Sequence, residues 1–240
     1  VWSSPDGINW TLVNTNPPFN NYYGSGSEYY EYQALVFGNK IYVIGGMPGN
    51  NNHAVLWSTT DGISWTVENP SAPFENRFLF SSVVHNGKIY VLGGRYSQTS
   101  LGNSGVWSSP DGINWTQLTT TPPWTSYLSN SKALSYDGKI YLLGGAIQTP
   151  TSGSLSTKVW SSLDGITWAF VGDTLPSSAY TTFETRDAIV AQGKIWLSNA
   201  AGFSGLQNII WSTVDGLTWA QSSTTPTWSP RWGYRFISNK

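Results

Sequence analysis

Short apolar segments rich in β-branched and aromatic residues recur along the chain, each directly after a tight, glycine-containing turn. The clearest segment runs from Ile41 to Ile44, and related segments begin after Lys88, Lys139 and Lys194. A second short apolar stretch precedes each turn, as at residues 32–37 and 79–84. No helical 3.6-residue periodicity is present, so the pattern predicts an all-β protein.

Between these segments one decapeptide pattern returns five times, at residues 2–11, 57–66, 107–116, 160–169 and 211–220. In the first copy Asp6 and Gly7 separate two stretches that carry Trp, Ser and Thr. Glycine adopts positive φ without steric cost and aspartate accepts hydrogen bonds from nearby amides, so the pattern predicts a β-hairpin. The first tryptophans of successive copies lie 55, 50, 53 and 51 residues apart.

Each repeat of about fifty residues therefore holds four strands, here called a, b, c and d, joined as two hairpins. Four short strands in a repeat of this length are typical of a β-propeller blade. The sequence predicts a single propeller domain over residues 1–240, with about five blades.

One predicted blade is incomplete. Five c–d hairpins and five candidate a strands are present, the last a strand at residues 232–237, but only four b strands, each beginning at a lysine. The last blade would be closed by N- and C-terminal strands and would lack strand b. Either the chain is a fragment of a ring of about six to eight blades, or a neighbouring chain donates the strand, by self-association or as a distinct partner.

The segments of the form Gly-Lys-Ile-Tyr-Val-Ile-Gly-Gly, followed by the tryptophan that opens strand c, resemble kelch repeats. The Ser-x-Asp-Gly-x-x-Trp hairpins, as in residues 4–10, resemble the Asp-box of sialidases and related propellers, with one residue fewer between Asp and Trp. Together the two patterns cover nearly the whole chain. Both resemblances imply a propeller, and because both families host unrelated activities, neither implies one function.

Composition narrows the classes of partner. Lys plus Arg number 12 and Asp plus Glu 13, for a net charge of -1, so no basic excess favours nucleic acid. No apolar run approaches the roughly 20 residues of a membrane span. Cysteine is absent, which excludes disulfides and cysteine nucleophiles. The composition suits an extracellular or cell-surface protein.

Antiparallel strand order places the a–b and c–d turns on one face and the b–c and d–a loops on the other. The turns are short and nearly identical, whereas the loops are long and dissimilar, which favours a binding site on the loops. Aromatic loop residues suit contacts with glycans and proteins. The aromatic candidates are Tyr22, Tyr23, Tyr29, Tyr30, Tyr96, Trp124 and Trp228. Trp124 and Trp228 also follow prolines at comparable positions, as Phe19 and Phe74 do, which indicates packing instead.

Arginines form a second set of candidates. Arg77, Arg186 and Arg231 lie at or just before a strands in three repeats, and Arg95 lies in a b–c loop. Three guanidinium groups converging at the channel mouth would bind a carboxylate, as in sialidases. The alternative is that these arginines hydrogen-bond neighbouring loops.

Catalytic chemistry has little support in the residue inventory. Most aspartates occupy turns, and a glycosidase would need two opposed carboxylates. Glu184 and Asp187 could meet Glu28 or Glu31 near the central channel, but no spacing in the sequence supports this. His53 and His85 are too far apart in the sequence for a metal site or a triad. The sequence predicts a recognition domain without catalytic residues, cofactor or metal, which binds glycan or protein. A sialidase-type glycoside hydrolase and a structural repeat domain of a fibre or surface assembly are the alternatives.

Overall fold

The computed structural model describes residues 1–21, 32–45, 54–74, 77, 79–94, 105–124, 127–148, 153–176, 187–198 and 209–222. These residues form antiparallel β-sheets, and the helical structure among them is one 3-10 turn, η1 (Pro18–Asn21). The prediction of an all-β protein is confirmed.

Four of the sheets have four strands each, joined in the order a, b, c, d. Blade 1 consists of β3 (Gln33–Phe37), β4 (Lys40–Gly45), β5 (Val55–Thr59) and β6 (Thr66–Asn69). Blade 2 consists of β7 (Ser81–His85), β8 (Lys88–Leu92), β9 (Val106–Ser109) and β10 (Thr116–Thr119). Blade 3 consists of β12 (Lys132–Tyr136), β13 (Lys139–Leu143), β16 (Lys158–Ser162) and β17 (Ala169–Asp173). Blade 4 consists of β18 (Ala188–Ala191), β19 (Lys194–Ser198), β20 (Ile210–Thr213) and β21 (Ala220–Gln221).

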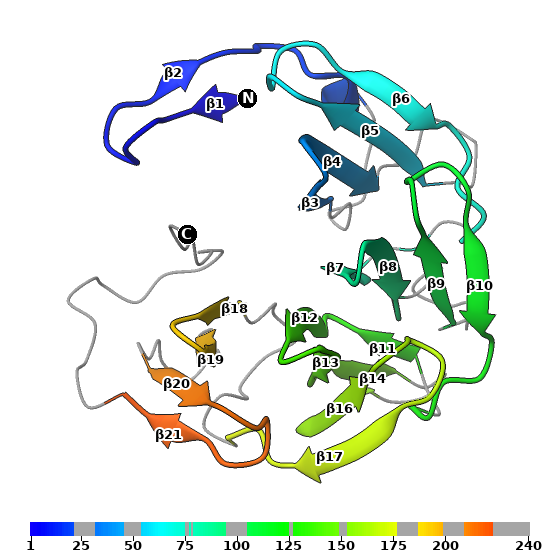
Figure 1. The fold of residues 1–240 in the computed structure, drawn as a ribbon, viewed down its shortest axis with the longest axis vertical. Coiled ribbons are helices and arrows are strands. Elements are labelled where there is room, and N and C mark those ends of the chain that lie inside the picture. The colour runs from blue at the N-terminus through cyan, green and yellow to red at the C-terminus, as the bar shows by residue number, and fades with distance from the viewer. Residues whose placement is uncertain are drawn as a thin grey trace.

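The blades are arranged around a common centre, with the a strands β3, β7, β12 and β18 nearest to it and the d strands outermost (Figure 1). This confirms a β-propeller of four-stranded antiparallel blades, four of them complete in the described part. The first Asp-Gly hairpin forms a separate two-stranded sheet of β1 (Trp2–Ser3) and β2 (Thr11–Leu12). The a strand predicted at residues 232–237 lies outside the described residues.

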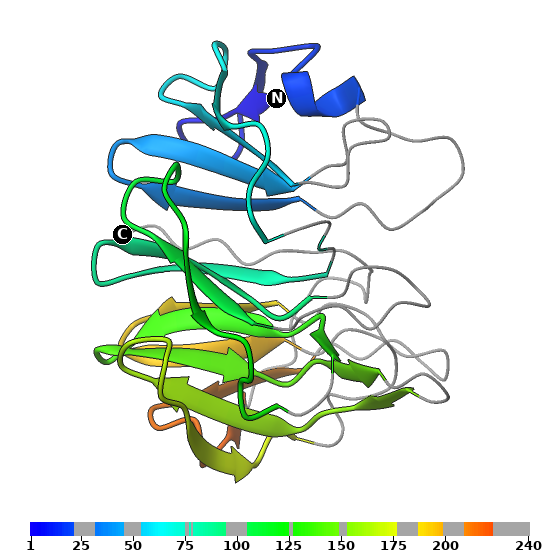
Figure 2. The same cartoon turned by 90° about the vertical axis from the view of Figure 1, so that its right-hand side faces the viewer.

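The a–b and c–d turns lie at one end of the strands, as predicted (Figure 2). We call this end the turn face, and the opposite end, where the b–c and d–a connections begin, the loop face. The described connections of the loop face include a three-stranded sheet that the sequence did not predict. It pairs β11 (Tyr127–Ser129) with β14 (Ala146–Gln148), and β14 with β15 (Gly153–Leu155).

Leu128 of β11 attaches this extra sheet to blades 2 and 3. Its side chain is buried between blades 2 and 3, and its carbonyl accepts a hydrogen bond from the amide of Gly94 at 2.8 Å. A Cβ atom on Gly93 would collide with the carbonyl oxygen of Leu128, and one on Gly145 would lie 2.8 Å from its side chain. The glycine pairs at the ends of the b strands of blades 2 and 3 therefore let the d–a connection approach the backbone closely.

The hydrophobic core is divided among the interfaces between adjacent blades. At each of three successive interfaces an aromatic residue that follows a proline packs edge-on against the second tryptophan of the next hairpin. The ring centroids are 4.9 Å apart for Phe19 and Trp65, 4.9 Å for Phe74 and Trp115, and 5.0 Å for Trp124 and Trp168. The prediction that Phe19, Phe74 and Trp124 serve packing is confirmed.

A tyrosine of strand b contacts the turn glycine of the next blade at three interfaces. A Cβ atom on that glycine would lie 2.7–2.9 Å from the ring, which no real side chain tolerates; the pairs are Tyr42 with Gly112, Tyr90 with Gly165, and Tyr141 with Gly216. Burial raises the pKa of all three tyrosines. Each turn glycine also has positive φ, so two independent constraints require glycine there.

The hairpin aspartate holds the same turn in place from within. In residues 107–116, Asp111 Oδ1 accepts the amide hydrogens of Ile113 and Asn114 at 2.8 and 2.7 Å, and Ser109 Oγ accepts that of Gly112 at 2.8 Å. Burial raises the pKa of Asp111, but the hydrogen bonds from Asn114 and Ile113 outweigh it and lower this pKa to about 2. The equivalent aspartates in the other four hairpins also have lowered pKa values.

Alanine at Gly112 and at Gly7 separates the two constraints, because residues 107–116 and 2–11 have identical sequences. Both glycines have left-handed φ, of +80° and +75°, but no described atom lies within 4 Å of a Cβ on Gly7. We expect Gly7→Ala to cost about 1 kcal/mol from backbone strain. Gly112→Ala should cost about 2 kcal/mol more through the collision with Tyr42. Equal losses in denaturant unfolding would show that the tyrosine contact is unimportant.

Asp111→Asn tests the contribution of the ionised carboxylate. A carboxyl whose pKa is lowered on folding stabilises the folded state above its unfolded pKa, near 3.8, and this stabilisation disappears as the pH falls through the folded value, about 2. The variant should therefore be less stable than the parent at pH 7, by about 1–2 kcal/mol. The two proteins should converge between pH 4 and 2. A stability difference that persists at pH 2 in urea titrations would assign the effect to something other than charge.

Candidate functional site

The loop-face ends of the inner strands carry polar residues at one shared register position in all four complete blades. Gln33, Ser81 and Lys132 lie opposite Ile44, Leu92 and Leu143 of their b strands. At the same position of blade 4, the carbonyl of Asp187 accepts a hydrogen bond from the amide of Ser198. We call Gln33, Ser81, Lys132 and Asp187 the inner rim. These four residues differ in chemistry from blade to blade.

Lys132 and Asp187 join adjacent blades across the inner rim. Lys132 Nζ lies 2.8 Å from Asp187 Oδ1, and the side chain of Asp187 is 4% exposed whereas that of Lys132 is 31% exposed. The hydroxyl of Ser198 donates to the Asp187 carbonyl at 3.0 Å, which fixes the backbone that carries the carboxylate. The result is a carboxylate held inside the rim, with an ammonium group partly open to solvent.

Serines continue the polar line toward blade 2. The Ser81 hydroxyl donates to the carbonyl of Ser131, and the two hydroxyl oxygens lie 3.2 Å apart. Both serines are buried, at 3% and 8% exposed. From blade 2 to blade 4 the inner rim therefore carries a hydroxyl, an ammonium and a carboxylate group in succession, and among these three the Lys132 ammonium group is the partly exposed one.

Arg77, the described member of the predicted arginine set, lies in the interior. Its Nη1 donates to the carbonyls of Gly93 and Gly105 at 3.1 and 2.8 Å, and the residue is 8% exposed. It thereby ties the end of strand b to the approach of strand c within blade 2. Trp124, the described aromatic candidate, is 5% exposed and packs against Trp168. In the described structure Arg77 and Trp124 therefore contact other parts of the propeller and are buried.

The other predicted site residues lie outside the described residues, so their convergence stays a prediction. They are Tyr22, Tyr23, Tyr29, Tyr30, Arg95, Tyr96, Arg186, Trp228 and Arg231, and the same holds for Glu28, Glu31, Glu184 and His53. Sequence reasoning did not single out Ser81 or Lys132. Aligning the four repeats on the lysine that begins strand b would have identified both, because the inner-rim position then shows a different polar residue in each repeat.

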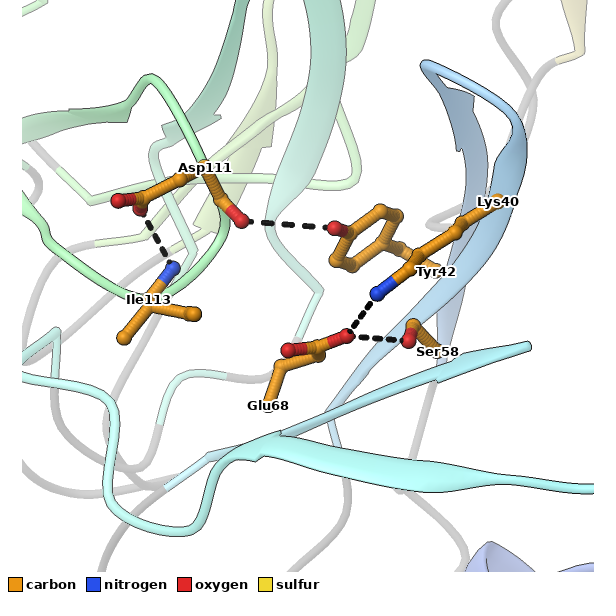
Figure 3. A network of polar contacts seen from close by, with 6 residues as sticks. All are labelled: Lys40, Tyr42, Ser58, Glu68, Asp111 and Ile113. Carbon is orange, nitrogen blue, oxygen red and sulfur yellow. Dashed lines mark hydrogen bonds and ion pairs between the residues drawn. The ribbon is translucent and has the colours of Figure 1, made fainter. Parts of the chain in front are cut away.

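A second polar cluster lies toward the turn face between blades 1 and 2 (Figure 3). Glu68 Oε1 accepts from Lys40 Nζ at 2.6 Å and from Ser58 Oγ at 2.5 Å, and these two contacts lower the pKa of Glu68. Nearby, the Tyr42 hydroxyl donates to the Asp111 carbonyl at 3.4 Å. Glu68 occupies the strand position that Leu118 and Val171 hold in blades 2 and 3. Lys40 and Ser58 therefore provide hydrogen-bond partners for a carboxylate that stands where the other blades have an apolar side chain.

His85 of β7 also has structural partners. It is 2% exposed, with Nδ1 lying 2.9 Å from Ser135 Oγ and Nε2 lying 3.3 Å from the Leu163 carbonyl, so it bridges blades 2 and 3. Within the described ranges no group of three or more His, Cys, Asp or Glu side chains could hold a metal ion. No helix in the same ranges is long and apolar enough to cross a membrane.

Removing Lys132 should weaken the join between blades 3 and 4. Lys132→Ala takes the ammonium group from a carboxylate that is 4% exposed, and we expect a loss of about 1–2 kcal/mol in the free energy of unfolding. Lys139→Ala is the matched control, since Lys139 begins β13 on the turn face and forms no ion pair among the described residues. Urea unfolding in which both variants lose the same amount would contradict a role for the pair.

Comparisons with known proteins agree with the architecture. No curated protein matches the sequence. Among solved structures, one titled "Structure of YjhT" is similar with a TM-score of 0.62 and 16% sequence identity, over 83% of this chain and 66% of that chain. The chain thus spans just under two thirds of YjhT, and at this identity the likeness shows the fold alone. Residues 1–222 match the family model of the DUF6242 beta propeller domain, and the chain belongs to that family.

Proposed function

We propose that this propeller is a recognition domain that binds a glycan or a protein surface through its loop face, outside the cell or at the cell surface. The observation that carries the proposal is the inner rim. Its positions share one structural place but carry an amide, a hydroxyl, an ammonium and a carboxylate, whereas the turn face repeats the same capped hairpin. Dissimilar polar groups on a uniform scaffold are what selective binding requires.

The rim chemistry favours a glycan over an apolar partner. Sugar hydroxyls both donate and accept hydrogen bonds, and the two partly exposed rim groups suit them: the Gln33 amide can donate and accept, and the Lys132 ammonium group can donate. The aromatic residues predicted for the loops would add flat faces for stacking. The resemblance of the repeats to kelch and Asp-box sequences is compatible with this proposal, since both occur in propellers of many functions.

The described carboxylates support binding more than hydrolysis. The hairpin aspartates are held by turn amides, Glu68 by Lys40 and Ser58, and Asp187 by Lys132. A glycosidase needs one carboxylic acid and one carboxylate on opposite sides of the scissile bond. Each carboxylate named here instead has a structural partner within its own blade or the adjacent one.

A glycan array followed by titration calorimetry tests the proposal. We expect the parent chain to retain a subset of glycans, with Lys132→Ala weakening the affinity for the best ligand about tenfold or more, because a charge-assisted hydrogen bond is lost. Lys139→Ala on the turn face should bind like the parent. Binding of glycans that is unaffected by Lys132→Ala would move the site away from the inner rim.

Hydrolysis assays on chromogenic glycosides, sialosides included, separate recognition from catalysis. We expect no turnover above that of buffer. Turnover that is lost in Arg186→Ala would replace the recognition proposal with a sialidase-type glycoside hydrolase. Retention of no glycan, together with no turnover, would favour a protein ligand or a structural repeat in an assembly.

A further inference from the structure

The inner edge of β1 differs from the corresponding edge of every complete blade. In blades 1 to 4 the c strand pairs with strand b on one side and strand d on the other, whereas β1 pairs only with β2 in the described part of the chain. The tryptophan that opens strand c shows the consequence. Trp57 is 0% exposed in blade 1, and its equivalent Trp2 is 59% exposed.

Gly62 in blade 1 shows which side chain would complete this edge. The hairpin glycines of blades 2, 3 and 4 each face a tyrosine ring from strand b of the preceding blade. Gly62 faces Val1 and Val13 of the β1–β2 hairpin at 3.6 and 3.7 Å, and no tyrosine lies within 4 Å among the described residues. Val1 and Val13 are the equivalents of Val159, which lies near Gly216, and Leu118, which lies near Gly165. Among the described residues, Gly62 thus has contacts from strands c and d of the kind that Gly216 and Gly165 have, but no contact from a strand b.

The repeats also define the chemistry of the occupant. Strands β4, β8 and β13 begin Lys-Ile-Tyr and continue with two aliphatic residues, and the tyrosine of β4 pairs with Ser58 of β5. Ser3 of β1 is the equivalent of Ser58. A strand of this pattern, placed antiparallel to β1 with its tyrosine opposite Ser3, would direct the ring at Gly62 and cover Trp2.

We propose that the inner edge of β1 is a strand-acceptor site, filled by an extended segment of the Lys-Ile-Tyr-aliphatic pattern from outside residues 1–240. Main-chain hydrogen bonds to β1 provide affinity, and the tyrosine ring against Gly62 provides register and specificity. The proposal concerns assembly and is independent of ligand binding at the loop face.

A synthetic peptide with the sequence of residues 38–46 tests this site on the full 240-residue chain. At saturation it should raise the melting temperature by about 5 °C, because it binds the folded state alone. Hydrogen exchange should slow at the amides of β1. The peptide with Tyr42→Ser should bind about tenfold more weakly, since it keeps the backbone pairing and loses the ring contact.

Gly62→Ala and Gly7→Ala form a matched pair of protein variants, as both glycines have left-handed φ, of +72° and +75°. An alanine methyl group at residue 62 occupies the place of the tyrosine ring, so a labelled peptide should bind Gly62→Ala at least tenfold more weakly. The same peptide should bind Gly7→Ala as it binds the parent. Equal affinities for the two variants would overturn the proposed register.

Three other outcomes would overturn the proposal. The first is no change in melting temperature or exchange at about 1 mM peptide. The second is protection on outer strands such as β6 or β21 instead of β1, which would indicate nonspecific pairing of edges. The third is protection of β1 in the chain without peptide. In a monomer this would mean that residues of the same chain cover the edge, and in a concentration-dependent dimer that a second copy does.

Discussion

The contact between a strand b tyrosine and the turn glycine of the next blade links the local structure of this protein to its global arrangement. The aspartate accepts the amide hydrogens that follow the glycine, and the turn so formed places that glycine at positive φ with no side chain on its outer surface. The tyrosine ring of the neighbouring blade then packs where a Cβ atom would be. The Asp-Gly pair therefore contributes both to the hairpin conformation and to the close packing of adjacent blades, so few other residues would fit at these two positions.

This constraint explains why variation is concentrated at the loop face. Every Asp-Gly hairpin turns toward the same end of the propeller, so the residues at that end are committed to capping and blade packing. At the opposite end the strands start and finish without such a requirement, and the inner-rim position is glutamine, serine, lysine or aspartate in the four complete blades. The glycine pairs after strand b add space for close backbone approach, as Leu128 shows beside Gly93 and Gly145. Each blade thus has a turn-face end whose sequence is repeated and a loop-face end whose sequence differs between blades.

The sequence was sufficient to predict the strands, the hairpins and the blade because all three depend on short-range patterns. Asp6, Gly7 and Trp10 lie in the same hairpin turn, and the strand after Lys40 is recognised by its own run of β-branched and aromatic residues. The sheet that joins β11 to β14 and β15 was not predicted, because it depends on the approach of Leu128 to a glycine of another blade. The ion pair of Lys132 and Asp187 spans 55 residues, and the partners of Arg77 are backbone carbonyls that no residue pattern reveals.

The identical decapeptides at residues 2–11 and 107–116 show which structural features the local sequence determines and which it does not. In both, the tryptophan Nε1 of the hairpin donates to the glycine carbonyl, at 3.2 Å from Trp10 and 3.1 Å from Trp115, and the aspartate accepts the same pair of amides. Their burial nevertheless differs, because residues 107–116 lie beside β8 and receive the ring of Tyr42, whereas Trp2 and Trp10 remain 59% and 54% exposed. The decapeptide therefore encodes its own turn but not its burial, which comes from the inner strand beside it and the tyrosine of the preceding blade. In this propeller a hairpin forms from ten residues, and it becomes part of a blade only when strand b is paired with it.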